Sequence, residues 1–128
     1  MRLFIGLVLA LWSVTAAAFD PTRWIYVKGG TWIPSPTELR KIEEVLKPAA
    51  VGTTRDAGQP HAWEEYRFQF QGRTDSRGRK FVFVNAFCNE PGSANLAAVW
   101  VGVAEVAGCY FSAKYDSEER RVYEFRQS

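Results

Sequence analysis

The sequence has few of the residues that most catalytic and metal sites use. Its 128 residues include one histidine and two cysteines. A structural zinc site needs cysteine and histidine ligands in closely spaced pairs, whereas His61, Cys88 and Cys109 are spread over almost fifty residues. The sequence also lacks the Gly-x-Ser-x-Gly turn of serine hydrolases and a glycine-rich phosphate loop. We therefore expect no catalytic residues, no metal and no cofactor.

The sequence also lacks a strong charge of one sign. Its formal net charge is +2, and it falls to +1 if Arg2 is removed with the leader described below. Binding of duplex nucleic acid usually needs a broad basic surface. After residue 18, no apolar run approaches the ~20 residues that a membrane-spanning helix requires. We expect neither a duplex nucleic-acid partner nor a membrane span after the leader.

The first eighteen residues have the pattern of a secretory signal peptide. Arg2 is the positive start, residues 3–14 are apolar, and residues 16–18 are the small side chains of a cleavage site. The apolar run is too short to serve as a membrane anchor. We expect residues 1–18 to be removed and residues 19–128 to form a single domain in the periplasm or outside the cell.

One helix is predicted after a short first strand at residues 24–27. Ser35 is a good N-cap, Pro36 suits the first helical position, and Glu38 completes a capping box. Pro48 is expected to end the helix. The apolar residues at helical spacing, expected on one buried face, are Leu39, Ile42, Val45 and Leu46.

The rest of the chain reads mainly as strands. Tyr66, Phe68 and Phe70 alternate with polar residues, which predicts one buried face and one solvated face that includes Gln69 and Gln71. Residues 81–87 are apolar on both faces, as in a central strand. Residues 96–106 fit a helix or a strand, and their valines favour a strand.

The last two segments complete the predicted sheet. Residues 109–115 alternate with Cys109 and Phe111 on one face, and a charged turn leads to a final strand with Tyr123 and Phe125 inward. The predicted fold class is α+β, with one N-terminal amphipathic helix packed on an antiparallel sheet of four or five strands.

The two cysteines are predicted to form a disulfide. The destination of an exported chain is oxidising, and Cys88 ends one predicted strand where Cys109 begins another. A loop of this length makes the bridge worth about 3 kcal/mol on the chain-entropy model. The alternative is a nucleophilic cysteine activated by His61, which would also need a group to orient that base.

Two sets of side chains are candidates for binding a partner. The hairpin after the second strand carries basic residues around Asp75 alone, which favours an acidic partner or, as the alternative, a solvated loop. Trp63 and Trp100 fall at positions where one or both can be exposed. The basic candidates are Arg73, Arg77, Arg79 and Lys80.

The stretches "FVFVNAFC" and "GCYFSAKYD" resemble a pair found in small exported bacterial proteins of unassigned role. That resemblance covers about the last fifty residues and implies the fold and the disulfide, but no activity. The helix-and-sheet layout is similar to the cystatin-like architecture. Cystatins inhibit cysteine proteases through a Gln-x-Val-x-Gly hairpin, and here "QFQGR" lacks both the valine and the spacing. Protease inhibition is therefore not implied.

These observations predict an exported, non-catalytic module that binds a protein, for example as an inhibitor of a hydrolase from the cell envelope or from outside. One alternative is a structural or assembly component of the envelope. The other is a small hydrolase that uses His61 together with a carboxylate such as Glu64.

Overall fold

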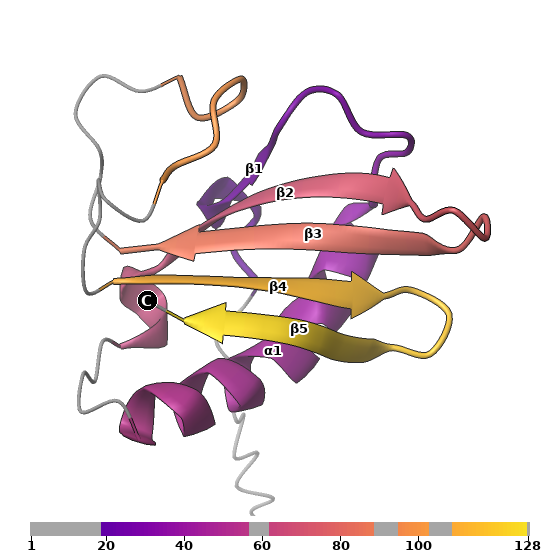
Figure 1. Ribbon diagram of the computed structural model, residues 1–128. Helices are drawn as coiled ribbons and strands as arrows, with labels where there is room; N and C mark the ends of the chain where they lie inside the picture. Colours follow the sequence, from indigo (N-terminus) through magenta and orange to yellow (C-terminus); the bar gives the residue numbers. More distant parts are fainter. Residues whose placement is uncertain (1–18, 57–61, 89–94, 103–108, 128) are drawn as a thin grey trace, which may run out of the picture.

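The computed structural model describes residues 19–56, 62–88, 95–102 and 109–127. These residues form one five-stranded sheet with a long helix across one face (Figure 1). The strands lie in the order β1-β2-β3-β4-β5. The elements are β1 (Trp24–Tyr26), α1 (Pro36–Asp56), β2 (Arg67–Thr74), β3 (Lys80–Phe87), β4 (Tyr110–Asp116) and β5 (Arg121–Gln127), with short 3-10 turns at Pro21–Arg23 and Trp63–Glu65.

The α+β class is confirmed, but two details of the prediction are wrong. The helix is not N-terminal, because α1 follows β1. The sheet is mixed, because β1 pairs with β2 in parallel while the other neighbours are antiparallel. The two corrections share a cause: a helix between two strands returns the chain to the same end of the sheet, so the second strand runs in the direction of the first.

α1 starts with the predicted Ser35 N-cap, but Glu38 Oε1 has no hydrogen-bond partner to complete the predicted capping box, and the helix does not end at Pro48. The Ser35 hydroxyl accepts a hydrogen bond from the Glu38 amide at 3.2 Å. The helix runs through Pro48 to Asp56. A proline inside a helix removes one backbone hydrogen bond, but Ala50 in the next turn is 2% exposed in the core. Packing of this turn against the sheet offsets the local penalty.

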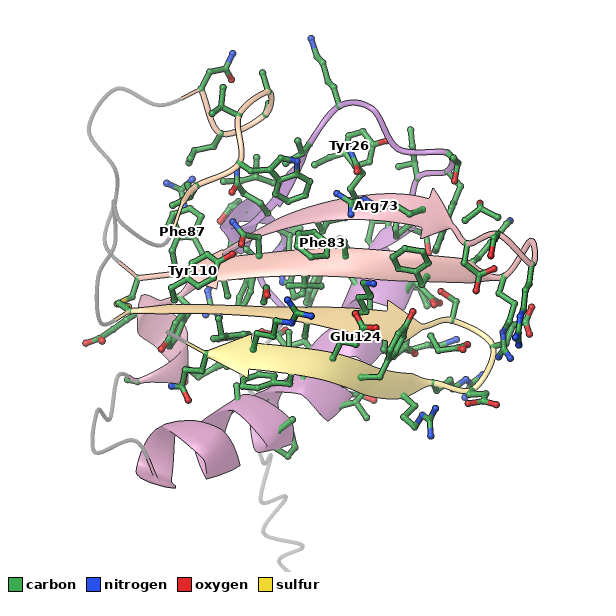
Figure 2. The ribbon with its side chains drawn as sticks, viewed as in Figure 1. Tyr26, Arg73, Phe83, Phe87, Tyr110 and Glu124 are labelled. Carbon is green, nitrogen blue, oxygen red and sulfur yellow. A yellow bond between two sulfur atoms is a disulfide. The ribbon has the colours of Figure 1, made fainter. Side chains whose placement is uncertain are left out.

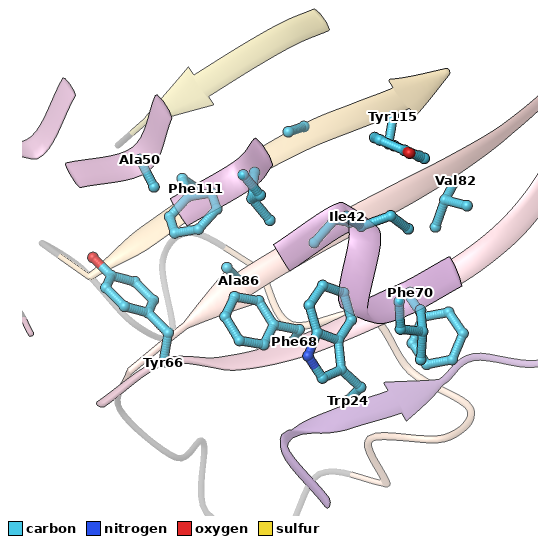
Figure 3. Close-up of a cluster of buried hydrophobic side chains, with 14 of the residues drawn as sticks. Trp24, Ile42, Ala50, Tyr66, Phe68, Phe70, Val82, Ala86, Phe111 and Tyr115 are labelled. Carbon is cyan, nitrogen blue, oxygen red and sulfur yellow. The ribbon is translucent and has the colours of Figure 1, made fainter. Parts of the chain in front are cut away.

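The inner face of the sheet, which we define as the face toward α1, carries the main core (Figure 3). Phe68 lies between two tryptophans, with ring centroids 4.4 Å from Trp24 and 4.9 Å from Trp63. Leu39, Ile42 and Leu46 of α1 are buried as predicted, whereas Val45 is 36% exposed. The other buried core residues are Ala50, Tyr66, Phe70, Val82, Val84, Ala86, Cys109, Phe111, Ala113 and Tyr115.

A β-bulge changes which residues of β5 point inward. Val122 and Phe125 pack on the inner core, and Phe125 stacks on Phe111 at 5.2 Å. Tyr123 pairs with Lys114, on the opposite face. The prediction that Tyr123 points inward is therefore wrong. The irregular pairing opposite Ser112 and Lys114, together with the left-handed backbone of Glu124 (φ 48°), shifts the alternation by one residue.

The predicted disulfide between Cys88 and Cys109 is confirmed. Their Cα atoms are 5.5 Å apart, and they lie where β3 ends and β4 begins. Phe111, Ala113 and Tyr115 follow Cys109 on the inner face, as the alternation predicts. The predicted leader, residues 1–18, and His61 lie outside the described residues. Within the described part of the chain, no helix combines the length and apolar character needed to cross a membrane.

Candidate functional site

The outer face of the sheet, opposite α1, buries three amide side chains. Gln69 is 0% exposed, Asn85 1% and Gln71 6%. The prediction that Gln69 and Gln71 lie on a solvated face is therefore wrong. Buried polar groups of this kind are costly unless they form hydrogen bonds, and the partners of these amides are the backbones of two loops that lie over the sheet.

Gln69 fixes the segment 95–102 on the outer face. Its Nε2 donates to the carbonyls of Leu96 (2.9 Å) and Val99 (2.7 Å). Its Oε1 accepts from the Val101 amide (2.9 Å) and from Asn85 Nδ2 (3.0 Å). Asn85 Nδ2 also donates to the Val101 carbonyl at 3.1 Å. Three hydrogen bonds of this buried glutamine therefore hold the loop, and the fourth orients Asn85, which also bonds the loop.

Side-chain bonds take the place of the strand predicted at 96–106. Residues 96–99 form a turn, with the amides of Ala98 and Val99 bonded to the Asn95 carbonyl. Gln69 bonds the carbonyl of Val99, and Gln69 and Asn85 bond the backbone of Val101, in place of a neighbouring strand. Strand pairing is therefore absent at 96–102, and residues 103–106 lie outside the described part of the chain.

Gln71 links the second loop to Arg73. Its Nε2 donates to the carbonyls of Val27 (3.3 Å) and Lys28 (2.9 Å). Its Oε1 accepts from Arg73 Nε at 2.6 Å. The two loops also meet, because the Lys28 amide donates to the Ala97 carbonyl at 3.1 Å. The orientation of the Arg73 guanidinium is thus set by a buried neighbour on its own strand.

Arg73 lies in a pocket between the sheet and the segment 95–102. Its guanidinium carbon is 4.5 Å from the ring centre of Phe83 and 5.5 Å from that of Trp100. The two rings meet edge to face at 5.1 Å. Arg73 and Phe83 lie side by side on the face turned to the viewer in Figure 2, with Tyr110 toward the disulfide end. The pocket has a volume of about 220 Å³ and is lined by Arg73, Phe83, Asn85, Trp100, Val101 and Tyr110.

Arg73 has no carboxylate partner in the described part of the chain, in contrast to Lys114 and Arg79 on the same face. Lys114 pairs with Glu124 at 2.8 Å, and Arg79 pairs with Asp116 at 2.8 Å. Among the described residues, no carboxylate forms an ion pair with Arg73. Burial of its guanidinium lowers the pKa of Arg73 from its ordinary value, but an arginine stays charged in a protein. The pocket therefore holds a positive group with unused donors against aromatic walls.

The predicted basic residues do not form one patch. At the tip of the β2–β3 hairpin, the Arg79 guanidinium forms an ion pair with Asp116, and the carboxylates of Glu118 and Glu119 lie 3.6 and 3.7 Å from it. Asp75 accepts the amides of Arg77 and Arg79, and these hydrogen bonds help lower the pKa of its carboxyl. Near the tip these side chains line a hollow of about 230 Å³, which also holds carboxylates.

Lys80 and Trp63 lie apart from the outer pocket. The Lys80 ammonium is 5.4 Å from the ring centre of Trp32, which packs against the inner core. Trp63 is 6% exposed, and its indole donates to Glu43 of α1 at 2.8 Å. Of the candidates named from the sequence, Arg73 and Trp100 therefore line the outer pocket, and Arg77 and Arg79 line the hollow near the tip.

Sequence reasoning missed Asn85, Phe83 and Tyr110 as members of this pocket. A usable signal was present: Asn85 stands alone within the apolar run "FVFVNAF", and two glutamines alternate along the neighbouring strand. Isolated amides in strands that are otherwise buried suggest polar partners from another part of the chain.

No family model, curated protein or solved structure matches the chain. The resemblances to small exported bacterial proteins and to the cystatin-like layout therefore stay predictions. Among the described residues, no three histidine, cysteine or carboxylate side chains form a group that could hold a metal ion.

Proposed function

We propose that the protein is an exported, non-catalytic module that binds another protein through the outer face of its sheet, around Arg73. The observation that carries this proposal is the Arg73 guanidinium, held by Gln71 against Phe83 and Trp100 without a carboxylate partner in the described residues. Arginine and tryptophan are the side chains that most often dominate the energy of protein interfaces.

The surroundings of the pocket support a protein partner. Val99 lies next to Trp100 in sequence and is 54% exposed, so it adds apolar surface at the rim. The Gln69 and Gln71 hydrogen bonds hold both loops in place before any partner arrives. Preorganisation of this kind reduces the entropy lost on binding. Export to the periplasm or the medium would place the partner in one of those compartments.

Photo-crosslinking tests the proposed face. Benzoylphenylalanine at Val99 would report contacts beside the pocket, and the same group at Val45 would report contacts on the exposed side of α1, so two exposed valines form a matched pair. With envelope and culture fractions of the source cells, we expect a discrete adduct from Val99 and none from Val45. Replacing Arg73 with glutamine should remove the Val99 adduct. An adduct from Val45 alone would overturn the proposal.

A further inference from the structure

We infer that the Arg73 pocket binds a carboxylate, presented as an aspartate or glutamate side chain of the partner protein. This inference rests on the proposed function and specifies the chemistry of the anchor. Its starting point is the fork of the Arg73 guanidinium: Nε is bonded to Gln71, while the described residues supply neither an ion pair nor a hydrogen bond to the two terminal nitrogens. Parallel N–H donors of this geometry match a carboxylate.

The walls of the pocket strengthen such a contact. Phe83 and Trp100 adjoin the guanidinium at 4.5 and 5.5 Å, and burial partly removes it from water. A charge pair attracts more strongly where the local dielectric constant is low. Lys114 and Arg79 on the same face already have carboxylate partners, whereas Arg73 has none among the described residues and lies against aromatic rings.

The lining favours an acidic side chain over a chain terminus. Proteins usually bind a terminal carboxylate with a nest of free backbone amides. Phe83 and Asn85 lie on β3, which has paired strands on both sides, so the backbone there is used by the sheet. The pocket offers side-chain donors, and its volume of about 220 Å³ admits the end of one side chain entering from a segment that crosses the sheet.

Nuclear magnetic resonance titration of the full domain with single-carboxylate probes tests this inference. N-acetylglutamate α-methylamide carries only a side-chain carboxylate, N-acetyl-leucine carries only a terminal one, and the glutamine analogue of the first probe is neutral. We expect the glutamate probe to shift the Arg73 Nε–H and Trp100 indole signals until they saturate. The glutamine probe should leave both signals unchanged, and N-acetyl-leucine should bind more weakly than the glutamate probe.

Variants separate the pocket from general charge. Arg73→Gln should weaken glutamate-probe binding at least about tenfold, and Arg73→Lys should weaken it several-fold because lysine lacks the planar fork. Arg126→Gln is the matched control, since Arg126 is an exposed arginine of the same face outside the pocket. The Arg126→Gln variant should bind the glutamate probe as well as the unchanged protein does. Dispersed amide spectra will show that each variant is folded. If Arg73→Gln does not fold, Arg73→Lys supplies the test.

Several outcomes would overturn the inference. They are equal binding of the glutamine probe, unchanged binding by the Arg73 variants, or no saturable shift at all. Tighter binding of N-acetyl-leucine would overturn the assignment to an acidic side chain. If these probes fail while Val99 still cross-links a partner, the carboxylate anchor falls and the proposed function stands. If the glutamate probe binds but Val99 cross-links no partner, the carboxylate anchor stands and the proposed function falls.

Discussion

The inner face of the sheet is covered by α1, whereas the outer face is covered only in part, by loops bonded to β2 and β3. On the inner face, α1 and two tryptophans bury aromatic and aliphatic side chains, with Phe68 fully enclosed. On the outer face, loop backbones cover the strands and are held by Gln69, Gln71 and Asn85. Apolar packing is tolerant of the direction of approach, whereas hydrogen bonds are directional. The outer face can therefore hold a loop and a guanidinium in one fixed arrangement.

The largest loss of stability is expected from a substitution on the inner face. Phe68→Ala should lower the free energy of unfolding by about 3–5 kcal/mol, because it leaves a cavity between Trp24 and Trp63. Urea unfolding will measure this change. Val45→Ala, at an exposed position of α1, should change stability by less than about 0.5 kcal/mol. If the two substitutions cost the same, the inner face is not the main core.

A smaller and more local effect is expected on the outer face. Gln69→Leu should lower the free energy of unfolding by about 2–3 kcal/mol, because the Val101 amide and the Asn85 side chain lose a buried acceptor. Hydrogen exchange at the Val101 amide should rise by more than global unfolding explains. Gln71→Leu serves as the comparison, since it should spare Val101 and loosen the residues around Lys28. Equal exchange at Val101 in both variants would contradict separate loop attachments.

The smallest change in stability is expected from a substitution at the rim of the outer face, at Asp116. The amides of Glu119 and Glu118 donate to Asp116 and, with Arg79, lower the pKa of its carboxyl below the ordinary value. A lowered pKa stabilises the folded state above the ordinary value, and this contribution is lost as the pH falls through the folded-state pKa. Asp116→Asn should therefore flatten the acid side of a urea-midpoint profile and leave binding at Arg73 unchanged. An unaltered profile would show that Asp116 has no such role.

The buried residues of the inner face were predictable because apolar and polar residues alternate along the strands. Alternation along 66–70 and 109–115 identified the buried aromatic residues, and two cysteines at strand ends identified the disulfide. The end of α1 was missed because Pro48 is a local signal, while the packing of Ala50 on the sheet is a tertiary effect.

The outer face was mispredicted for a different reason. Alternation distinguishes apolar from polar positions, but it does not distinguish water from a loop backbone as the partner of Gln69. The same limit applies to residues 96–102, whose valines favour a strand but whose backbone is bonded by side chains. Arg73 and Trp100 were both named from the sequence, yet their meeting depends on how that loop folds over the sheet.

The disulfide has a consequence for the pocket wall. Trp100 belongs to the segment between Cys88 and Cys109, which are 21 positions apart in the sequence and joined where β3 meets β4. When the contacts of Gln69 break transiently, the ends of this segment stay joined by the Phe87–Tyr110 strand pair and by the disulfide directly beyond it. Recapture is then an intramolecular event at high effective concentration. The disulfide should matter most when the strand ends separate: an oxidised chain then keeps the two ends of the segment joined, whereas a reduced chain depends on the Phe87–Tyr110 pair alone.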